Sequence, residues 1–262
     1  MNLIAKHLRE YYRTNGLASA IARALKLAVT VPRVRRYRRF VAGLDGRRPA
    51  AVFCEIYAQG LWKVGTSHSG PGSELPYTEN LRFFLPILFE RFRIRTIVDA
   101  ACGDFNWMQF LPLTKEMSYV GLDIVPEVIA QNQRRHGDGR RRFAIANIVT
   151  DPLPAADVVM CRDCLFHLSN RDVALVLQNF VASKSRYLLT SSHVNDGGFI
   201  NTDIKTGHFR MIDLFSAPFC LPRNVHFAID DYIPPFPPRT MCLWDREQIA
   251  SALQDLKLLE TS

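Results

Sequence analysis

The chain has 262 residues, of which 48% are hydrophobic and 22% are charged, and it contains 14 Gly and 15 Pro. This ordinary globular composition excludes a disordered, fibrous or collagen-like protein, and the length suffices for one domain whose core needs neither metal nor disulfide. The six cysteines have no regular spacing and no cleavable signal is identified ahead of them, so the sequence predicts free thiols and a cytoplasmic protein.

The positive charge of the chain is concentrated in residues 1–48. That segment carries twelve Lys or Arg and two acidic residues, a net charge of +10, whereas the whole chain carries +8. No nucleic-acid partner is expected, because a nucleic-acid enzyme more often spreads positive charge over the domain that performs the chemistry. We predict a basic helical extension over 1–48 and a catalytic domain over 49–262.

Within this extension, residues 17–31 are rich in Ala and Leu and are predicted to form a helix. Arg23 and Lys26 interrupt the apolar run, which is also too short to span a bilayer. Two interpretations stay open. The helix packs on the catalytic domain with a solvated basic face, or the arm attaches peripherally to a membrane surface or another anionic partner.

The next elements alternate between helical and extended patterns. Residues 78–92 start at a Thr suited to cap a helix, although Pro86 is expected to kink or shorten it. Pro126 and Gly137 bound a later helix, and Ser169-Asn-Arg-Asp172 is typical of another helix start. Five short apolar runs are predicted as strands, at 96–100, 119–123, 142–146, 157–162 and 186–192. Together they predict an α/β fold with a doubly wound, mainly parallel sheet.

Residues 197–244 lose this alternation, and they are predicted to form a loop-rich insertion that ends in a strand near 240–244. Asn201, Asp203 and Arg210 are candidates either to bind a hydroxylated acceptor or to cap turns. The aromatic side chains of the insertion are candidates for the same acceptor site: Phe199, Phe209, Phe215, Phe219, Phe227, Tyr232 and Phe236.

Ligands of an open parallel sheet bind at the carboxyl ends of the strands, where the strand order reverses. The first strand ends in Asp99 and a turn with a single glycine, Gly103, whereas a dinucleotide fingerprint has three glycines. This disfavours a pyrophosphate ligand and a nicotinamide-dependent oxidoreductase. The second strand ends in Asp123, a carboxylate placed to accept the hydrogen bonds of a ribose diol. S-adenosylmethionine, which has a ribose and no diphosphate, fits both observations.

These motifs resemble those of the class I S-adenosylmethionine-dependent methyltransferases over roughly residues 78–192, which form the predicted core. The resemblance rests on four segments: 98–105 (VDAACGDF), 119–124 (YVGLDI), 143–147 (FAIAN) and 156–168 (ADVVMCRDCLFHL). It implies a Rossmann-like methyltransferase fold with S-adenosylmethionine as the cofactor. The segment 62–73 looks like the lead-in of a bacterial subgroup, and it either folds over the cofactor's carboxylate or the acceptor, or forms an exposed connector.

The resemblance also implies a set of cofactor-binding residues. In the family, the turn after the first strand passes close to the methionine moiety, and the acid after the second strand binds the ribose. An acid after the third strand commonly accepts a hydrogen bond from the adenine, and the sequence has an Asn at that position. The predicted cofactor site consists of Asp99, Ala101, Gly103, Asp123, Ile124, Asn147, Ile148 and Arg162.

Methyl transfer from a sulfonium is an in-line displacement, so the alignment of donor and acceptor supplies much of the acceleration. A hydroxyl acceptor benefits from a base, and His167, which follows the fourth strand, is the first candidate; a packing or capping role is its alternative. His193, after the fifth strand, is the second candidate. Asp163 is predicted to orient the acceptor or contact the adenosine, or else to form an internal ion pair with Arg162.

Cys161 and Cys164 form a Cys-x-x-Cys pair, but no second pair or His pair accompanies it, so we predict no metal site. The sequence therefore predicts a methyltransferase that acts on a small-molecule or glycan hydroxyl. A non-catalytic regulatory or scaffold protein that binds S-adenosylmethionine is the alternative.

Overall fold

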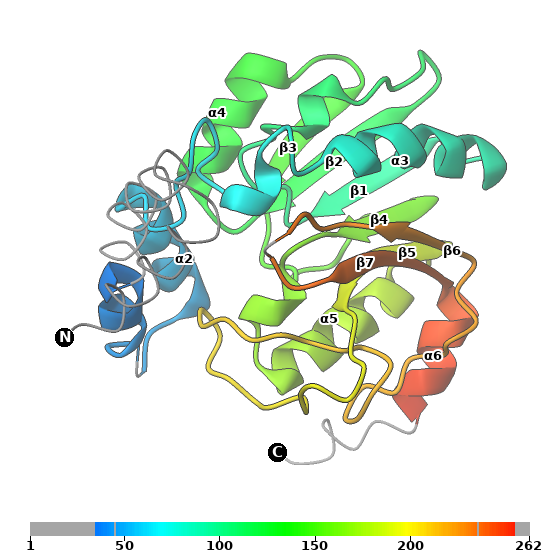
Figure 1. Ribbon diagram of the computed structural model, residues 1–262. Helices are drawn as coiled ribbons and strands as arrows, with labels where there is room; N and C mark the ends of the chain where they lie inside the picture. Colours follow the sequence, from blue (N-terminus) through cyan, green and yellow to red (C-terminus); the bar gives the residue numbers. More distant parts are fainter. Residues whose placement is uncertain (1–34, 45, 235, 255–262) are drawn as a thin grey trace, which may run out of the picture. The chain divides into compact units, whose positions relative to one another are not determined.

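The computed structural model describes residues 35–44, 46–234 and 236–254 (Figure 1). The chain divides into two units, Met1–Gly46 and Arg47–Ser262. In the first unit, residues 35–41 are helical, and the helix predicted at 17–31 lies outside the described residues. Across the described ranges, none of the helices combines the length and the apolar character needed to cross a membrane. The division at 48 stays a prediction.

The second unit is built around a seven-stranded sheet with the order β3-β2-β1-β4-β5-β7-β6. All neighbours from β3 to β5 are parallel, and β7 runs antiparallel to both β5 and β6. The strand order reverses between β1 and β4, which is where a doubly wound sheet opens a crevice for a ligand. The strands are β1 Thr96–Ala100, β2 Ser118–Asp123, β3 Arg141–Ile145, β4 Val158–Cys161, β5 Tyr187–His193, β6 Phe227–Asp230 and β7 Arg239–Asp245.

Helices cover both faces of this sheet, as Figure 1 shows: α3 and α4 lie on one face, and α5 and α6 lie on the other. A further helix, α2, precedes them in the chain, and three single-turn 3₁₀ segments interrupt the loops. The helices of this unit are α2 Pro49–Ala58, α3 Glu79–Arg91, α4 Pro126–His136, α5 Asn170–Ala182 and α6 Arg246–Gln254.

The core consists of one hydrophobic cluster on each face of the sheet. In β1, Ile97 packs in the cluster that contains Leu85 of α3, and Val98 packs in the cluster that contains Phe180 of α5. Side chains alternate across a strand, so both faces of β1 must be apolar. This double burial explains why the central strands occur in the sequence as uninterrupted apolar runs.

The predicted fold class is confirmed, and β1 has its predicted bounds. One local prediction was wrong. The insertion contains a strand, β6, which is short and pairs only with β7 at the edge of the sheet, and so has no apolar run. Thr78 is the N-cap residue of α3 as predicted, although its hydroxyl donates to the Glu74 and Leu75 carbonyls, and the helix continues through Pro86 instead of ending there.

The helix ends predicted for α4 and α5 are those of the structure. Pro126 is the first residue of α4, and Gly137 is its C-cap. Ser169 caps α5, and its hydroxyl accepts a hydrogen bond from the Asp172 N–H at 3.1 Å. The backbone N–H of Ser169 donates to the Thr206 hydroxyl at 2.9 Å, so a residue of the insertion completes this cap.

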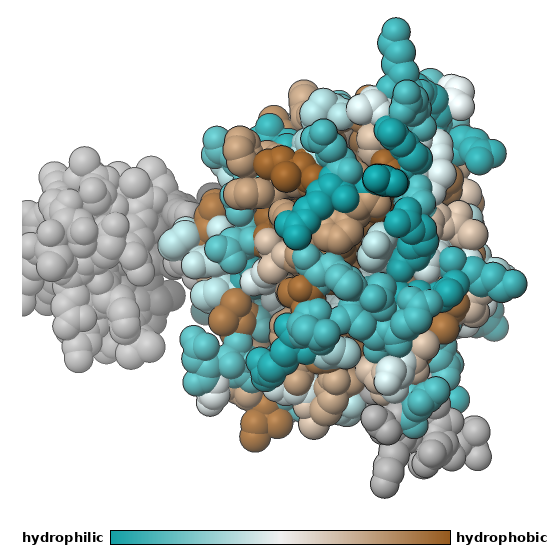
Figure 2. Space-filling model, turned by 90° about the vertical axis from the view of Figure 1, so that its right-hand side faces the viewer, coloured by the Kyte–Doolittle hydropathy of each residue, from teal (hydrophilic) through white to brown (hydrophobic). Residues whose placement is uncertain are grey.

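The surface offers little apolar area on the face that Figure 2 presents. Hydrophobic residues occur there as small separate groups among hydrophilic ones, without a broad apolar patch. Single exposed apolar side chains are normal on soluble domains and need no partner. The functional site is therefore sought in the interior, at the carboxyl edge of the sheet.

Candidate active site

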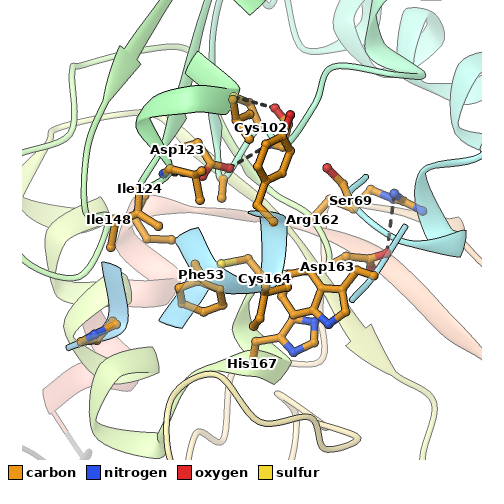
Figure 3. Close-up of a pocket in the computed structure, with 18 of the residues that line it drawn as sticks. Phe53, Ser69, Cys102, Asp123, Ile124, Ile148, Arg162, Asp163, Cys164 and His167 are labelled. Atoms are coloured by element: carbon orange, nitrogen blue, oxygen red, sulfur yellow. Dashed lines mark hydrogen bonds and ion pairs between the residues drawn. The ribbon is translucent and has the colours of Figure 1, made fainter. Parts of the chain in front are cut away.

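A cavity of about 1110 Å³, counting the part that opens to solvent, lies at the carboxyl ends of the parallel strands. Its floor comes from residues that follow β1, β2, β3 and β4, at the switch point of the sheet. Residues of α2 and of the segment 62–73, which we call the strap, complete the lining. Figure 3 shows Asp123, Ile124 and Ile148 together on one side of this cavity, and Asp163, Cys164 and His167 together on another.

The turn after β1 is held by the carboxylate that ends β2. Gly103 has a φ of +54°, and its N–H donates to Oδ2 of Asp123 at 3.0 Å. The N–H of Val125 donates to Oδ1 at 3.0 Å. Burial raises the pKa of Asp123, while these N–H groups act in the opposite direction and favour the carboxylate. Each Asp123 oxygen thus keeps a lone pair for a ligand in the cavity.

Asp99, the last acidic residue of β1, is buried in the cavity floor with 3% of its surface exposed. The Tyr119 hydroxyl donates a hydrogen bond to its Oδ2 at 2.7 Å. Burial raises the pKa of Asp99 to about 7, although the hydrogen bond from Tyr119 and the charge of Arg162 favour ionisation. A carboxyl group that titrates near neutral pH therefore faces the site.

Phe105 lies two residues after Gly103 in the turn that follows β1. Its side chain is buried against Tyr119 and Phe143, with ring centroids 5.1 Å away in both cases, and it does not line the cavity. A φ of +57° turns the backbone at this point. The large side chain thus leaves the cavity open.

Ala101, Ile124, Asn147 and Ile148, all predicted for the cofactor site, line the cavity. The Asn147 amide oxygen already accepts a hydrogen bond from the Val149 N–H at 3.1 Å. One lone pair of this oxygen and the amide N–H₂ are left for a ligand. The position therefore offers a donor as well as the acceptor that the sequence predicts.

Arg162 also lines the cavity, but other residues engage its guanidinium. Nε and NH2 each donate to the Asp231 carboxylate at 2.8 Å, and NH2 donates to the Gly72 carbonyl at 2.8 Å. Burial alone would lower the pKa of Arg162, but the carboxylates of Asp163 and Asp231 raise it, so the side chain stays charged. The pairing with Asp163 is looser, at 3.6 Å. Arg162 thus links the cavity wall to Asp231 and Gly72. Its contact with the cofactor stays a prediction.

Asp163 has a φ of +54° and lies between the two arginines of this buried cluster. Its Oδ2 pairs with NH2 of Arg239 at 2.9 Å, and its N–H donates to the Ser191 hydroxyl at 3.1 Å. The structure thus shows the ion-pair alternative, and because the carboxylate also lines the cavity, its contact with the acceptor or the adenosine stays a prediction.

Gly72 of the strap packs directly on this cluster, and we expect Gly72→Ala to destabilise the fold. A Cβ atom there would lie 2.5 Å from Oδ2 of Asp163 and 3.2 Å from NH2 of Arg239, so the ion pair would have to move. We expect a loss of about 1–3 kcal/mol in the free energy of unfolding, measured by urea titration. Gly139→Ala is the control, because nothing lies within 4 Å of a Cβ at that position. Equal stability of the two variants would contradict the prediction.

His167 lies in the wall of the cavity beyond β4. Its Nδ1 is 2.8 Å from the His208 carbonyl, and its ring stacks on Trp62 with centroids 4.5 Å apart. A carbonyl accepts but cannot donate, so Nδ1 carries the proton and Nε2 of the neutral ring has a free lone pair. Burial lowers the pKa of His167 to about 4. The ring is therefore neutral at physiological pH.

The structure does not bring the second candidate base into the cavity. His193 ends β5 in the core, where its Nδ1 accepts the Ile212 N–H at 3.2 Å, and burial lowers its pKa to about 4. Asn201, Asp203 and Arg210 also lie outside the lining. Two of them hydrogen-bond to backbone carbonyls: Asn201 donates to the Asp213 carbonyl at 2.7 Å, and Arg210 donates to the Leu168 carbonyl at 2.9 Å. The turn-capping alternative describes these side chains better than acceptor binding does.

The aromatic wall of the cavity comes from a segment that sequence reasoning missed. None of the insertion's aromatic residues lines the cavity, whereas Phe53 and Tyr57 of α2 and Trp62 of the strap do. Phe53 and Tyr57 are four residues apart, which places them on one face of a helix. That spacing was the sequence signal for this aromatic wall. From the insertion, Thr206 lines the cavity.

All six cysteines lie in the described residues and are free thiols. Cys164 lines the cavity, and Cys161 is buried beneath it in the core, with a pKa raised well above the ordinary thiol value by its contact with Cys164 and by burial. Within 35–44, 46–234 and 236–254, His, Cys, Asp and Glu side chains form no group suited to hold a metal ion.

Comparison with known proteins agrees with this geometry. Residues 98–181 match the family model described as a methyltransferase domain. Magnesium protoporphyrin IX methyltransferase from Synechocystis PCC 6803 with bound SAH is 13% identical, with a TM-score of 0.52 over 80% of this chain and 99% of that chain. The same enzyme with bound SAM gives 10% identity and a TM-score of 0.51 over 76% and 98%.

A third solved structure, the methyltransferase domain of bacterial CtHen1-C, is 10% identical with a TM-score of 0.50 over 64% of this chain and 98% of that chain. At these identities the structures establish the fold, and the family model establishes the domain. No curated protein sequence matches the chain significantly. The chain therefore shares the fold of these solved methyltransferases, and its residues 98–181 match a methyltransferase domain.

Proposed function

We propose that the protein transfers the methyl group of S-adenosylmethionine to a hydroxyl of a small molecule or glycan. The observation that carries the cofactor half of this proposal is the pair of buried carboxylates, Asp99 and Asp123, on either side of the Gly103 turn at the switch point. The structural neighbour that binds SAM and SAH acts on a porphyrin, which supports a small-molecule acceptor.

Each part of the cofactor has a proposed partner in the lining. Asp123 accepts the hydrogen bonds of the ribose diol with the lone pairs that Gly103 and Val125 leave free. Ile124 and Ile148 pack against the adenine, and Asn147 hydrogen-bonds its edge. Asp99 and the turn from Ala101 to Gly103 face the methionine end, where a carboxylate attracts an ammonium group.

When bound, the cofactor supplies an electrophilic methyl group on a sulfonium. The lining aligns donor and acceptor, and such positioning is worth roughly 7–11 kcal/mol in intramolecular models. His167 Nε2 would accept the proton of the acceptor hydroxyl while its oxygen bonds to the methyl carbon, and the carbon–sulfur bond would break to leave a neutral thioether. The His208 carbonyl keeps the His167 ring in the required tautomer.

The basic arm at 1–48 gives the main competing function: a regulatory or scaffold protein that binds S-adenosylmethionine without turnover. That alternative requires cofactor binding without any methylated product. We place the enzyme in the cytoplasm and keep an anionic partner or a membrane surface as a proposal for the twelve basic residues of the arm.

The proposal is tested by isothermal titration of S-adenosylmethionine into the wild type and Asp123→Ala. We expect the variant to bind about 10- to 150-fold more weakly, because hydrogen bonds to a charged carboxylate contribute about 1.5–3 kcal/mol. Asp196→Ala removes an exposed acid outside the cavity and should bind like the wild type.

A companion assay offers phenols, sugars, lipids and peptides as acceptors and identifies the products by mass spectrometry. Absence of binding at millimolar concentration, or label only on amines, would overturn the proposal.

A further inference from the structure

Part of the cavity lining has no proposed role in cofactor binding, and most of it is aromatic or apolar. We call this part the acceptor wall, and it consists of Phe53, Trp62, Cys164, His167, Leu168 and Thr206. In Figure 3, Cys164 and His167 lie together, away from Asp123 and Ile124. The acceptor wall thus contains the proposed base, and its chemistry selects the molecule that carries the reacting hydroxyl.

Aromatic rings form a large part of the acceptor wall. Trp62 stacks on His167 with ring centroids 4.5 Å apart and an interplanar angle of 25°. The ring of Phe53 lies 6.0 Å from that of Trp62 at an angle of 57°. A contact between two aromatic rings adds about 2- to 10-fold in affinity beyond the effect of buried area. The wall therefore favours an acceptor that is itself aromatic.

The acceptor wall has few polar atoms that a ligand could use. The Thr206 hydroxyl already accepts from the Ser169 N–H and donates to the Asp172 carboxylate. The Cys164 thiol is a weak donor. Nε2 of His167 makes no hydrogen bond to any of the described residues, so it is available to one hydroxyl. A glycan would bury further hydroxyls against apolar side chains, and each one left without a partner weakens binding about 5- to 150-fold.

The basicity of His167 also favours one kind of hydroxyl. Burial lowers the pKa of His167 to about 4, so the neutral ring is a weak base. A phenol has a pKa of about 10, whereas the pKa of water, which an aliphatic hydroxyl resembles, is about 15.7. Proton transfer to the ring is therefore far less unfavourable from a phenol than from a sugar hydroxyl.

From the ring contacts and the scarcity of polar partners, we infer that the acceptor is a phenol, a hydroxyl carried directly on an aromatic ring, and that Phe53 is a specificity-determining residue for it. The phenol oxygen bonds to the methyl carbon, the sulfur keeps the electron pair of the broken carbon–sulfur bond, and Nε2 of His167 takes the hydroxyl proton. The products are an aryl methyl ether and S-adenosylhomocysteine. This inference rests on the proposed function, which it narrows to one class of hydroxyl.

The test compares three bicyclic alcohols as acceptors for the wild type. They are 2-naphthol, 2-naphthalenemethanol, which keeps the aromatic ring but has an aliphatic hydroxyl, and decahydro-2-naphthol, which has no aromatic ring. Mass spectrometry measures the release of S-adenosylhomocysteine and the methylated product. We expect kcat/KM to be about 100-fold lower for 2-naphthalenemethanol than for 2-naphthol, and lower by about 2- to 10-fold again for decahydro-2-naphthol. Methyl β-glucoside should give no product.

Phe53→Leu tests the ring contact by itself, because it removes an aromatic ring and keeps an apolar side chain. Isothermal titration with S-adenosylhomocysteine present should show about 2- to 10-fold weaker binding of 2-naphthol and a change below about twofold for decahydro-2-naphthol. The affinity for S-adenosylmethionine should also change less than about twofold, since Phe53 has no proposed contact with the cofactor. Phe110→Leu is the matched control, because Phe110 is 54% exposed and lies outside the cavity lining.

Faster turnover of methyl β-glucoside or 2-naphthalenemethanol than of 2-naphthol would overturn the assignment of a phenol. Equal binding of 2-naphthol to the wild type and Phe53→Leu, or equal weakening of both bicyclic ligands, would overturn the role of Phe53. Thermal unfolding shows whether each variant is folded at the titration temperature. A wild type that binds no S-adenosylmethionine, or that methylates none of these hydroxyls, would instead refute the proposed function, and the acceptor class with it.

Discussion

Replacement of His167 by alanine is expected to lower kcat about 100-fold while the KM for S-adenosylmethionine changes little. Proton removal by a positioned base contributes about 10²–10⁴-fold, and efficiency is highest when the pKa of the base is near the working pH. Burial lowers the pKa of His167 to about 4, so we expect the lower end of that range. Initial-rate kinetics with a hydroxyl acceptor measure the change.

The pH profile of kcat gives a second expectation for His167. Because the ring is neutral above pH about 5, protonation of His167 should not reduce the rate between pH 6 and 8. His226→Ala is the control, since this histidine is partly exposed, pairs with Asp245 and lies outside the cavity. A wild-type kcat in His167→Ala would remove the base from the mechanism. Cofactor binding by the wild type without any methylated product would favour the non-catalytic alternative.

The central sheet was predictable because its strands are buried on both faces. Val158–Cys161 is buried at every position and Tyr187–His193 at every position but the first, whereas Arg141–Ile145 at one edge has a single buried residue. The edge strand Phe227–Asp230 has only one fully buried residue, Ile229, and it follows a proline-containing stretch. It pairs with β7, the next strand in the chain, across the short connection 231–238, whose proline cluster gives no hairpin signal.

The cofactor half of the site was predictable because its parts are local in the sequence. Asp99 and Gly103 belong to one turn, and Asp123 ends the next strand, so strand order alone brings them together. The partners of Arg162 were not predictable, because Asp231 and Gly72 reach it from separate loops. Buried ion pairs between distant segments leave no periodic signal in a sequence.

In the insertion, the sequence left open whether the polar residues bind an acceptor or cap turns, and in the structure they contact the fold. Arg210 and the Thr206 hydroxyl both hydrogen-bond to the segment that starts α5, and the His208 carbonyl orients His167. The insertion therefore acts on the site mainly through backbone and side-chain contacts to the turn after β4. Side-chain chemistry alone could not distinguish this supporting role from acceptor binding.

Replacement of Asp99 by asparagine is expected to stabilise the cofactor-free protein at pH 8 by about 4 kcal/mol. Burial raises the pKa of Asp99 to about 7 from an ordinary value of 3.8. Between these two values the folded state keeps a proton that the unfolded state loses, so the free energy of unfolding falls as the pH rises. Asparagine lacks this titration. Urea unfolding at pH 8 and pH 4 should show a gain at pH 8 and less than about 1 kcal/mol at pH 4.

The same substitution is expected to abolish the pH dependence of cofactor binding. If ionised Asp99 attracts the ammonium of S-adenosylmethionine, protonation of Asp99 should weaken wild-type binding roughly tenfold or more from pH 7.5 to pH 5.5. Asp99→Asn should bind weakly at both pH values, because the counter-charge is absent. Glu127→Gln, an exposed acid on α4, is the control and should keep the wild-type profile. A pH-independent affinity in the wild type would mean that Asp99 does not face the ammonium. If Asp99→Asn both stabilises the cofactor-free protein at pH 8 and removes the pH dependence of cofactor binding, the buried charge of Asp99 lowers the stability of the free protein and the bound cofactor offsets that loss.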